Sequence, residues 1–181
     1  MKRAVFLDRD GVLNEAVVVD GQPKAPLTAA EVVIPDDAHV SLMRMREAGF
    51  VLIVVTNQPD IPRGRMTWEN LHAVNSRLRD VLPLDDIRVC AHDDHHDCAC
   101  RKPRPGLLTA AARDHGVELA ESFLIGDRWK DVAAGQAAGC RTVWLNAGYD
   151  EPEPYPPADW TARTLADATD WLLAQPPRGG S

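Results

Sequence analysis

The chain has 181 residues, 45% of them hydrophobic, so it can bury one full core, and its length favours a single domain. The formal net charge of −7 and the isoelectric point near 5.3 disfavour nucleic acid as a partner, because phosphate backbones are bound by clustered Lys and Arg. No apolar run approaches the roughly 20 residues of a membrane span, and the N-terminus does not resemble a signal peptide. We therefore expect a cytoplasmic, monomeric protein that binds neither membranes nor nucleic acid.

The first predicted strand covers residues 4–7 and is followed by two aspartates one residue apart, Asp8 and Asp10. Residues i and i+2 of an extended chain face the same side, so both carboxylates can point at one centre, and Gly11 allows a sharp turn beside them. Two carboxylates this close repel each other unless a cation compensates, and Mg²⁺ prefers oxygen ligands. The alternative is that these aspartates only end a strand and begin a turn.

The rest of the chain alternates between helical and strand-like patterns. Residues 14–35 are rich in turn-forming residues, and we expect a loop there with a small hairpin around 17–19, over the mouth of the site. The patterns predict helices at 37–48, 67–82, 105–116, 131–139 and 165–174, the first two capped by Asp36 and Thr67, and strands at 50–55, 87–91, 122–126 and 141–145. Residues 151–157 are a loose proline-rich connection. A flexible tail at 176–181 would leave one domain over residues 1–175.

This alternation predicts an α/β fold with a mostly parallel central sheet, flanked by helices on both faces and joined by right-handed crossovers. Polar residues follow three of the strands, at 8–10, 56–58 and 127–131. The carboxyl ends of parallel strands lie at the same edge of a sheet, where such folds bind ligands. We therefore expect these three clusters to converge on one site.

Three of the four cysteines fall within eleven residues, together with a histidine. Cys90, His92, Cys98 and Cys100 supply three thiolates and one imidazole, a set suited to tetrahedral structural Zn²⁺ without an open position. The predicted zinc-binding loop, residues 90–100, has little apolar content of its own, so the metal would fold it. A loop with incidental thiols is the alternative, and His95 is a rival ligand beside His96.

Four stretches resemble, in their order and strand context, the motifs of haloacid dehalogenase (HAD) superfamily phosphatases: Asp8-Arg9-Asp10-Gly11, Thr56-Asn57-Gln58, Arg101-Lys102-Pro103 and Gly126-Asp127-Arg128-Trp129-Lys130-Asp131. The resemblance covers residues 3–148 and implies a Rossmann-like HAD fold and a phosphoric monoester hydrolase. The segments between the motifs are too short to hold an inserted cap domain.

The resemblance also implies roles for the motif residues. Asp8 would attack phosphorus to form an aspartyl-phosphate, and Asp10 would protonate the leaving alcohol and then activate water. Asp8, Asp127 and the backbone carbonyl of Asp10 would hold Mg²⁺. Thr56 and Lys102 would hold the transferring oxygens.

Together with the zinc loop, these motifs resemble the subgroup that contains the D-glycero-D-manno-heptose 1,7-bisphosphate phosphatases and the histidinol-phosphate phosphatases. A small phosphorylated substrate would then bind Asn57, Arg63, Arg101 and Lys102, the basic residues being suited to a second phosphate. Asp131 is expected to orient Lys102 or to cap the following helix rather than to bind metal.

We expect conversion of the heptose 1,7-bisphosphate to the 1-phosphate. Within the superfamily, a histidinol-phosphate phosphatase and a DNA-end phosphatase are alternatives, the latter disfavoured by the acidic charge. A non-catalytic, zinc-stabilised binding module is the alternative from another class. Pro59 and Asp60 stand where the resemblance implies a small residue and glycine, and Arg128 stands where many relatives carry Lys.

Overall fold

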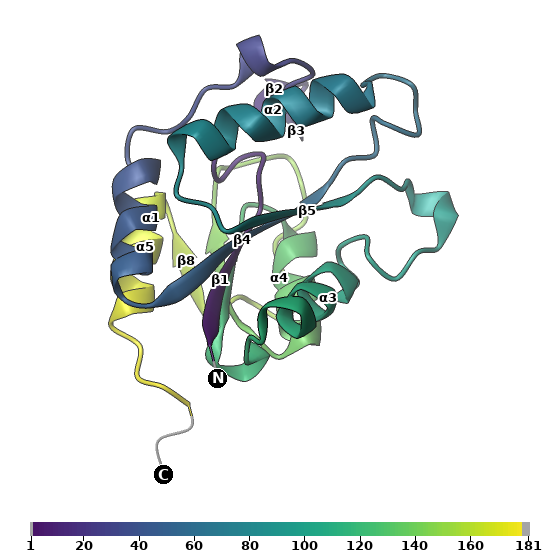
Figure 1. Cartoon of the computed structure of the whole chain (residues 1–181). Coiled ribbons are helices and arrows are strands. Elements are labelled where there is room, and N and C mark those ends of the chain that lie inside the picture. Colours follow the sequence, from purple (N-terminus) through teal and green to yellow (C-terminus); the bar gives the residue numbers. More distant parts are fainter. Residues whose placement is uncertain (1, 179–181) are drawn as a thin grey trace.

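The computed structural model describes residues 2–178, and Figure 1 shows a central sheet between layers of helices. The six strands of this sheet lie in the order β5-β4-β1-β6-β7-β8, and all adjacent pairs are parallel. Their bounds are β1 Arg3–Leu7, β4 Phe50–Asn57, β5 Asp86–Cys90, β6 Phe123–Gly126, β7 Arg141–Leu145 and β8 Trp160–Ala162. The predicted mostly parallel α/β architecture is confirmed.

The first strand lies inside the sheet, between β4 and β6. Leu7 at its end is paired with Val54 of β4 on one side and with Ile125 of β6 on the other. Its last four residues are buried, because helices cover both faces of the sheet, and this explains the continuous apolar run. Asp8 therefore leaves the sheet in the middle of its carboxyl edge.

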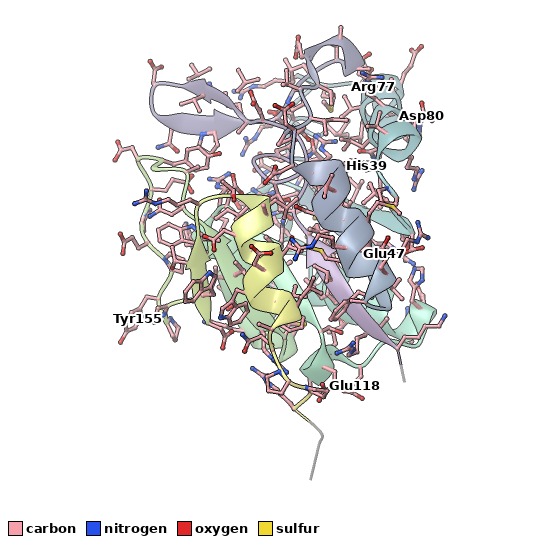
Figure 2. All side chains as sticks on the ribbon, turned by 90° about the vertical axis from the view of Figure 1, so that its left-hand side faces the viewer. His39, Glu47, Arg77, Asp80, Glu118 and Tyr155 are labelled. Atoms are coloured by element: carbon pink, nitrogen blue, oxygen red, sulfur yellow. The ribbon has the colours of Figure 1, made fainter. Side chains whose placement is uncertain are left out.

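Two pairs of helices cover the two faces of the sheet. α1 (Ala38–Glu47) and α5 (Leu165–Leu173) lie side by side over one face, as Figure 2 shows, and α3 (Gly106–His115) and α4 (Trp129–Ala138) cover the other. Each pair buries its own apolar cluster against alternate strand residues: Leu42, Met45 and Leu172 with Val5 on one side, and Leu108, Ala111 and Ala134 with Phe6 on the other. α2 (Trp68–Val81) lies across the carboxyl edge (Figure 1).

The predicted hairpin is present as β2 (Val17–Val19) and β3 (Gln22–Lys24), an antiparallel pair above the carboxyl edge. The backbone N–H of Asp150 donates to the carbonyl oxygen of Gly21 at 3.1 Å, and Nε2 of Gln22 donates to the carbonyl oxygen of Asp150 at 2.6 Å. These bonds attach the hairpin to the loop after β7. Three short 3₁₀ helices complete the fold of the described residues, at Ala29–Glu31, Asp94–His96 and Leu119–Glu121.

Two predicted helix starts were wrong. Asp37, not Asp36, occupies the N-cap position of α1, and its Oδ2 accepts a bond at 2.9 Å from the backbone N–H of Ala166 at the start of α5 instead of capping its own helix. α4 begins at Trp129 rather than Asp131, so that Asp131 occupies the third helical position. The N-cap Thr67 is confirmed, since its Oγ1 accepts from the backbone N–H of Asn70 at 3.1 Å.

The edge strand β8 was missed, because three residues, two of them exposed, show no periodicity. It is held by Asp159, whose Oδ2 accepts from the backbone N–H of Thr142 at 2.7 Å and from its hydroxyl at 3.0 Å. Of the predicted tail, Pro176 accepts a bond from Arg141 at 2.6 Å, and residues 179–181 lie outside the described part. No helix in residues 2–178 combines the length and the hydropathy needed to cross a bilayer.

Candidate active site

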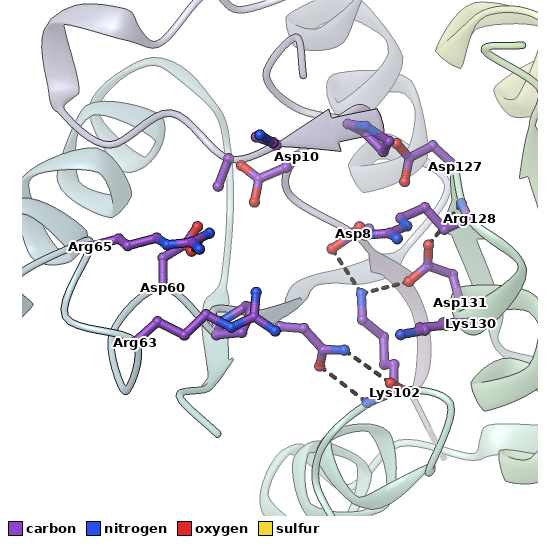
Figure 3. Close-up of a pocket in the computed structure, with 15 residues that line it drawn as sticks. Asp8, Asp10, Asp60, Arg63, Arg65, Lys102, Asp127, Arg128, Lys130 and Asp131 are labelled. Carbon is purple, nitrogen blue, oxygen red and sulfur yellow. Dashed lines mark hydrogen bonds and ion pairs between the residues drawn. The ribbon is translucent and has the colours of Figure 1, made fainter. Parts of the chain in front are cut away.

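A cavity of about 250 Å³ opens at the carboxyl edge of the sheet, where β1, β4 and β6 end (Figure 3). Charged side chains of both signs line it. The acidic ones are Asp8, Asp10, Asp60, Asp127 and Asp131, and the cationic ones are Lys24, Arg63, Arg65, Lys102, Arg128 and Lys130. The predicted convergence of polar clusters from different strands is confirmed.

Asp8 is buried and already hydrogen-bonded on one side. Its Oδ1 accepts from the backbone N–H of Arg9 and from Nζ of Lys102, both at 2.8 Å. Oδ2 has no hydrogen-bond partner among residues 2–178, so it is the oxygen left for a metal or a substrate. Burial raises the pKa of Asp8 from 3.8 to about 6 although the charge of Lys102 lowers it.

Lys102 reaches the site from a loop, and three groups fix its ammonium nitrogen. Nζ lies 2.8 Å from Oδ1 of Asp8, 2.6 Å from Oδ1 of Asp131 and 2.7 Å from the carbonyl oxygen of Val55. Asn57 holds the backbone of Lys102 from both sides, accepting from its N–H at 3.1 Å and donating to its carbonyl at 3.0 Å. Asn57 lines the cavity, but its amide group is used to position Lys102.

Asp131 both contacts Lys102 and caps the following helix, the two alternatives that the sequence analysis offered. One oxygen contacts Lys102, and Oδ2 accepts from the backbone N–H of Arg128 at 3.0 Å, which caps α4. Asp131 is therefore already engaged by protein groups, although its carboxylate is close to those of Asp8 and Asp127.

Asp127 follows β6 and is suited to hold a metal ion. Its side chain is buried, and neither carboxylate oxygen has a hydrogen-bond partner of good geometry within the described chain. Burial, and then the charge of Asp8, raise its pKa well above 3.8. Oxygens of Asp8 and Asp127 lie within 4.8 Å of each other, and such hard oxygen ligands fit Mg²⁺. Asp131 lies in the same cluster, but its oxygens are engaged by Lys102 and Arg128. A buried carboxylate is costly without a compensating cation, so the residues present fit the metal.

Asp10 is held by side chains for which the sequence analysis predicted no role. Its Oδ1 accepts from Nε of Arg9 at 3.0 Å and from Asn14 at 3.1 Å, and its Oδ2 accepts from Nη2 of Arg9 at 3.1 Å and from Gln58 at 2.8 Å. Gln58 also donates to Oγ1 of Thr56 at 2.9 Å. Thr56 is buried beneath the cavity and is not among the residues that line it, so its contact with a transferring oxygen stays a prediction.

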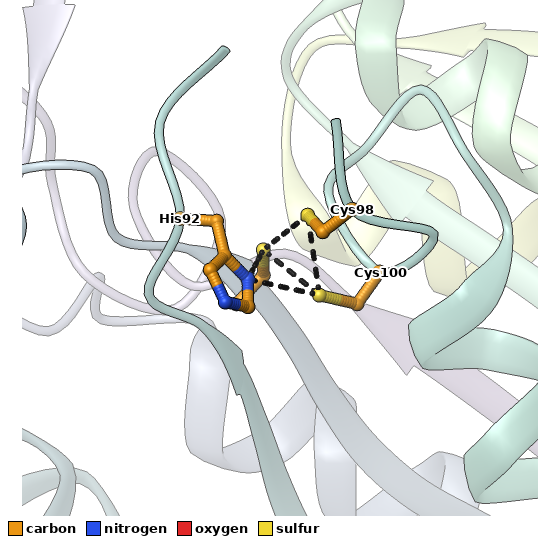
Figure 4. A group of neighbouring side chains, drawn as sticks. His92, Cys98 and Cys100 are labelled. Atoms are coloured by element: carbon orange, nitrogen blue, oxygen red, sulfur yellow. Dashed lines mark hydrogen bonds between the residues drawn. The ribbon is translucent and has the colours of Figure 1, made fainter. Parts of the chain in front are cut away.

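The four predicted zinc ligands are gathered at the end of β5 (Figure 4). The Sγ atom of Cys90 lies 3.7 Å from that of Cys98 and 3.2 Å from that of Cys100, and Nδ1 of His92 lies 3.5 Å and 3.3 Å from those of Cys90 and Cys100. Bonds of about 2.3 Å to a tetrahedral Zn²⁺ would separate thiolates by about 3.7 Å. The distances exceed a disulfide bond, and this donor set fits structural zinc.

The cationic residues predicted to bind substrate are arranged differently. Arg63 lines the cavity, whereas Arg101 does not. Nε of Arg101 instead donates to Oδ1 of Asp94 at 2.7 Å, and its Nη1 donates to the carbonyl oxygen of His92 at 3.1 Å, so it braces the zinc loop. Arg65 and Lys130, which also line the cavity, were missed, because only the fold brings them to this edge.

Comparison with known proteins identifies the family of the chain. The HAD-hydrolase-like family model matches residues 99–168. The D-glycero-beta-D-manno-heptose-1,7-bisphosphate 7-phosphatase of Escherichia coli (strain K12) is 34% identical in an alignment of 188 positions that covers 95% of this chain and 94% of that protein. The chain belongs to the HAD phosphatases.

Two further relatives place this HAD phosphatase in the predicted subgroup. The phosphatase of the same name from Helicobacter pylori (strain J99) is 31% identical, over 94% of this chain and 97% of that protein. The crystal structure of the D,D-heptose 1,7-bisphosphate phosphatase from B. bronchiseptica, complexed with magnesium and phosphate, superposes with a TM-score of 0.77 at 27% identity and covers 96% of this chain and 98% of that one. The protein is thus a phosphoric monoester hydrolase, as predicted.

Proposed function

We propose that this HAD phosphatase removes the 7-phosphate of D-glycero-β-D-manno-heptose 1,7-bisphosphate and releases the 1-phosphate. The observation that carries this proposal is the similarity, over more than nine-tenths of the chain, to relatives that are named for this activity. The cavity supports it, because an acidic group suited to a metal ion and several cationic side chains line the same space. A substrate with two phosphates matches this combination, because one phosphate can bind at the metal ion and the other at the cationic side chains.

In the first step, Oδ2 of Asp8 attacks the phosphorus of the 7-phosphate. A bond forms between this oxygen and phosphorus, the bond from phosphorus to the C7 oxygen breaks, and Asp10 gives that oxygen a proton. Asp10 is held for this transfer by Arg9 and Gln58. The product of the step is an aspartyl-phosphate and the heptose 1-phosphate.

In the second step, Asp10 takes a proton from water, and the water oxygen attacks phosphorus. The bond between phosphorus and Oδ2 of Asp8 breaks, which releases inorganic phosphate and restores the carboxylate. Lys102 lies beside the nucleophile throughout and offsets negative charge on the transferring group. Mg²⁺ held by Asp8, Asp127 and the backbone carbonyl of Asp10 would offset further negative charge.

The second phosphate would bind away from the three carboxylates, at the cationic residues of the cavity wall. Arg63 is the predicted substrate residue there, and the part of its guanidinium that Asp93 does not use can donate hydrogen bonds to phosphate. Arg65 and Lys130 line the same cavity and add positive charge. Arg101 is a weaker candidate than expected, because it lies outside the cavity and faces Asp94.

Phosphate release from a substrate panel tests the proposal. With Mg²⁺ present, we expect the heptose 1,7-bisphosphate to be the preferred substrate over histidinol phosphate and over phosphorylated DNA ends. One phosphate should be released per molecule, with the 1-phosphate left intact. Asp8→Asn should lower kcat at least about 1,000-fold while the fold is retained. Preference for histidinol phosphate would overturn the proposed substrate, and equal activity of wild type and Asp8→Asn would overturn the role of Asp8.

A further inference from the structure

An ion pair joins the zinc loop to the loop that follows β4. Nε of Arg63 lies 2.6 Å from Oδ2 of Asp93, and Nη2 of Arg63 lies 2.6 Å from Oδ1. Both bonds of this bidentate pair are short and charge-assisted, so they fix the plane of the guanidinium. Arg63 lines the substrate cavity, whereas Asp93 directly follows the zinc-ligand residue His92.

Asp93 is itself held by the backbone of the zinc loop. Its Oδ1 accepts from the backbone N–H of Asp94 at 2.8 Å, and its own N–H donates to Nδ1 of His96 at 3.0 Å. These two bonds start the short helix Asp94–His96. The direction of the Asp93 carboxylate therefore depends on the fold of the zinc loop, and the position of Arg63 depends on that carboxylate.

The pair leaves part of the guanidinium available for a ligand. Asp93 uses Nε and Nη2 of Arg63, and Nη1 has no hydrogen-bond partner within residues 2–178. In Figure 3 the Arg63 side chain extends from its loop toward the middle of the cavity. Its side chain is 36% exposed, so without Asp93 it would sample many rotamers.

A second pair in the same loop provides an internal comparison. Arg101 and Asp94 form an ion pair of similar length, 2.7 Å, but Arg101 lies outside the cavity. Both pairs brace the zinc loop, and only the Arg63–Asp93 pair also connects it to the cavity. Substitutions of Asp93 and of Asp94 can therefore be compared within the same loop.

We propose that Asp93 is a positioning residue that holds Arg63 in the cavity for the phosphate that is not hydrolysed. The inference rests on the proposed bisphosphate substrate. Through Asp93 the zinc loop sets the affinity for this substrate and leaves the chemical step at Asp8 unchanged. Preorganised Arg63 binds phosphate without losing side-chain entropy on binding.

Steady-state kinetics of Asp93→Asn test this inference with two substrates, the heptose 1,7-bisphosphate and p-nitrophenyl phosphate, which has a single phosphate. KM for the bisphosphate should rise about fivefold to tenfold with kcat within about twofold of wild type, and both constants for p-nitrophenyl phosphate should stay within about twofold. Asp94→Asn is the matched control and should leave all four constants unchanged. Zinc content, measured by atomic emission, should equal that of the wild type in both variants.

Arg63→Gln and the double variant Arg63→Gln/Asp93→Asn complete the test. The double variant should have the same KM for the bisphosphate as Arg63→Gln alone, because Asp93 acts only through Arg63. If Asp93→Asn leaves the KM for the bisphosphate unchanged, Asp93 has no effect on phosphate binding. If it lowers this KM, Asp93 competes with the phosphate for Arg63. Either result overturns the inference. If the Asp93→Asn protein loses zinc, the variant Arg63→Lys is used for the test instead. Arg63→Lys should raise the KM for the bisphosphate and leave that for p-nitrophenyl phosphate unchanged. An unchanged KM for the bisphosphate overturns the inference. A wild type without preference for the bisphosphate overturns the proposed substrate and this inference together.

Discussion

The ammonium nitrogen of Lys102 lies 2.6 Å from Oδ1 of Asp131, and each side chain is only 2% exposed. Burial alone would lower the pKa of Lys102, but the charges of Asp131 and Asp8 raise it above its ordinary value, so this lysine stays protonated. The other oxygen of Asp131 caps α4. One carboxylate therefore couples the start of a helix to the cation beside Asp8.

Asp131→Asn should reduce both stability and activity. The variant leaves Lys102 with less compensating charge in a buried position, so we expect the free energy of unfolding to fall by about 3 kcal/mol. Displacement of Lys102 should lower kcat by about 10-fold to 100-fold. Urea denaturation and phosphate release measure the two effects. Asp170→Asn is the control, because Asp170 pairs with Arg44 at 2.7 Å but is 67% exposed, and it should change neither quantity appreciably.

Gly11→Ala should selectively damage the metal site. Gly11 has a φ of +87°, and a Cβ there would lie 1.9 Å from Oδ2 of Asp127, so the carboxylate must move. We expect the rise in melting temperature caused by Mg²⁺ to fall to less than about half, and kcat/KM to fall at least about tenfold. Thermal-shift measurements with and without Mg²⁺ give the first quantity.

Gly49→Ala separates this effect from backbone strain. Gly49 has a φ of +85°, but nothing lies within 4 Å of its ideal Cβ position. Backbone strain should cost each variant about 1 kcal/mol of stability, because an L-residue is strained in the left-handed region. Only Gly11→Ala should lose the response to Mg²⁺. An equal loss of the Mg²⁺ response in both variants would contradict the explanation through Asp127.

The response to Mg²⁺ should depend on pH through Asp8. The folded protein without metal raises the pKa of Asp8 from 3.8 to about 6, so between these values it binds a proton that the unfolded chain releases. The contribution of Asp8 to the stability of the metal-free protein should therefore fall as the pH rises from about 4 to about 6. Mg²⁺ requires the carboxylate, so the rise in melting temperature that it causes should grow as the pH increases through about 6. A Mg²⁺ response that is equal at pH 5 and pH 8 would contradict this competition.

Loss of zinc should destabilise the loop that carries Lys102. We expect Cys98→Ser, or removal of zinc with a chelator, to lower the melting temperature by about 5 to 10 °C and to increase amide hydrogen exchange over residues 91–104. Cys140→Ala is the control, because Cys140 is a buried thiol whose pKa is raised to about 12 by its apolar surroundings. Cys140→Ala should retain zinc and the protection of residues 91–104. An unchanged melting temperature after zinc removal would count against a structural role.

Much of the candidate site could be predicted from the sequence. The apolar run of β1 must be buried, so the charged Asp8 has to mark its end. The same reasoning applies to Asp127 after β6, and parallel pairing brings both to one edge. Two of the four predicted zinc ligands are separated from the other two by five intervening residues in one loop, so local spacing was sufficient to predict that the four side chains gather.

Other features depend on contacts between segments far apart in the chain. The direction of Arg101 is set by Asp94, and that of Arg63 by Asp93, and spacing alone does not determine which cation reaches the cavity. Asn57 was predicted to bind substrate, but its amide is bonded to the backbone of Lys102, 45 residues later.

The sequence by itself determined where strands end in carboxylates and which four side chains can share one zinc ion, because burial of apolar runs and short ligand spacing are local properties. Only the tertiary structure decided which charges pair with each other and which face the substrate. A guanidinium or an amide binds whichever acceptor the fold brings within about 3 Å, and that partner comes from another part of the chain.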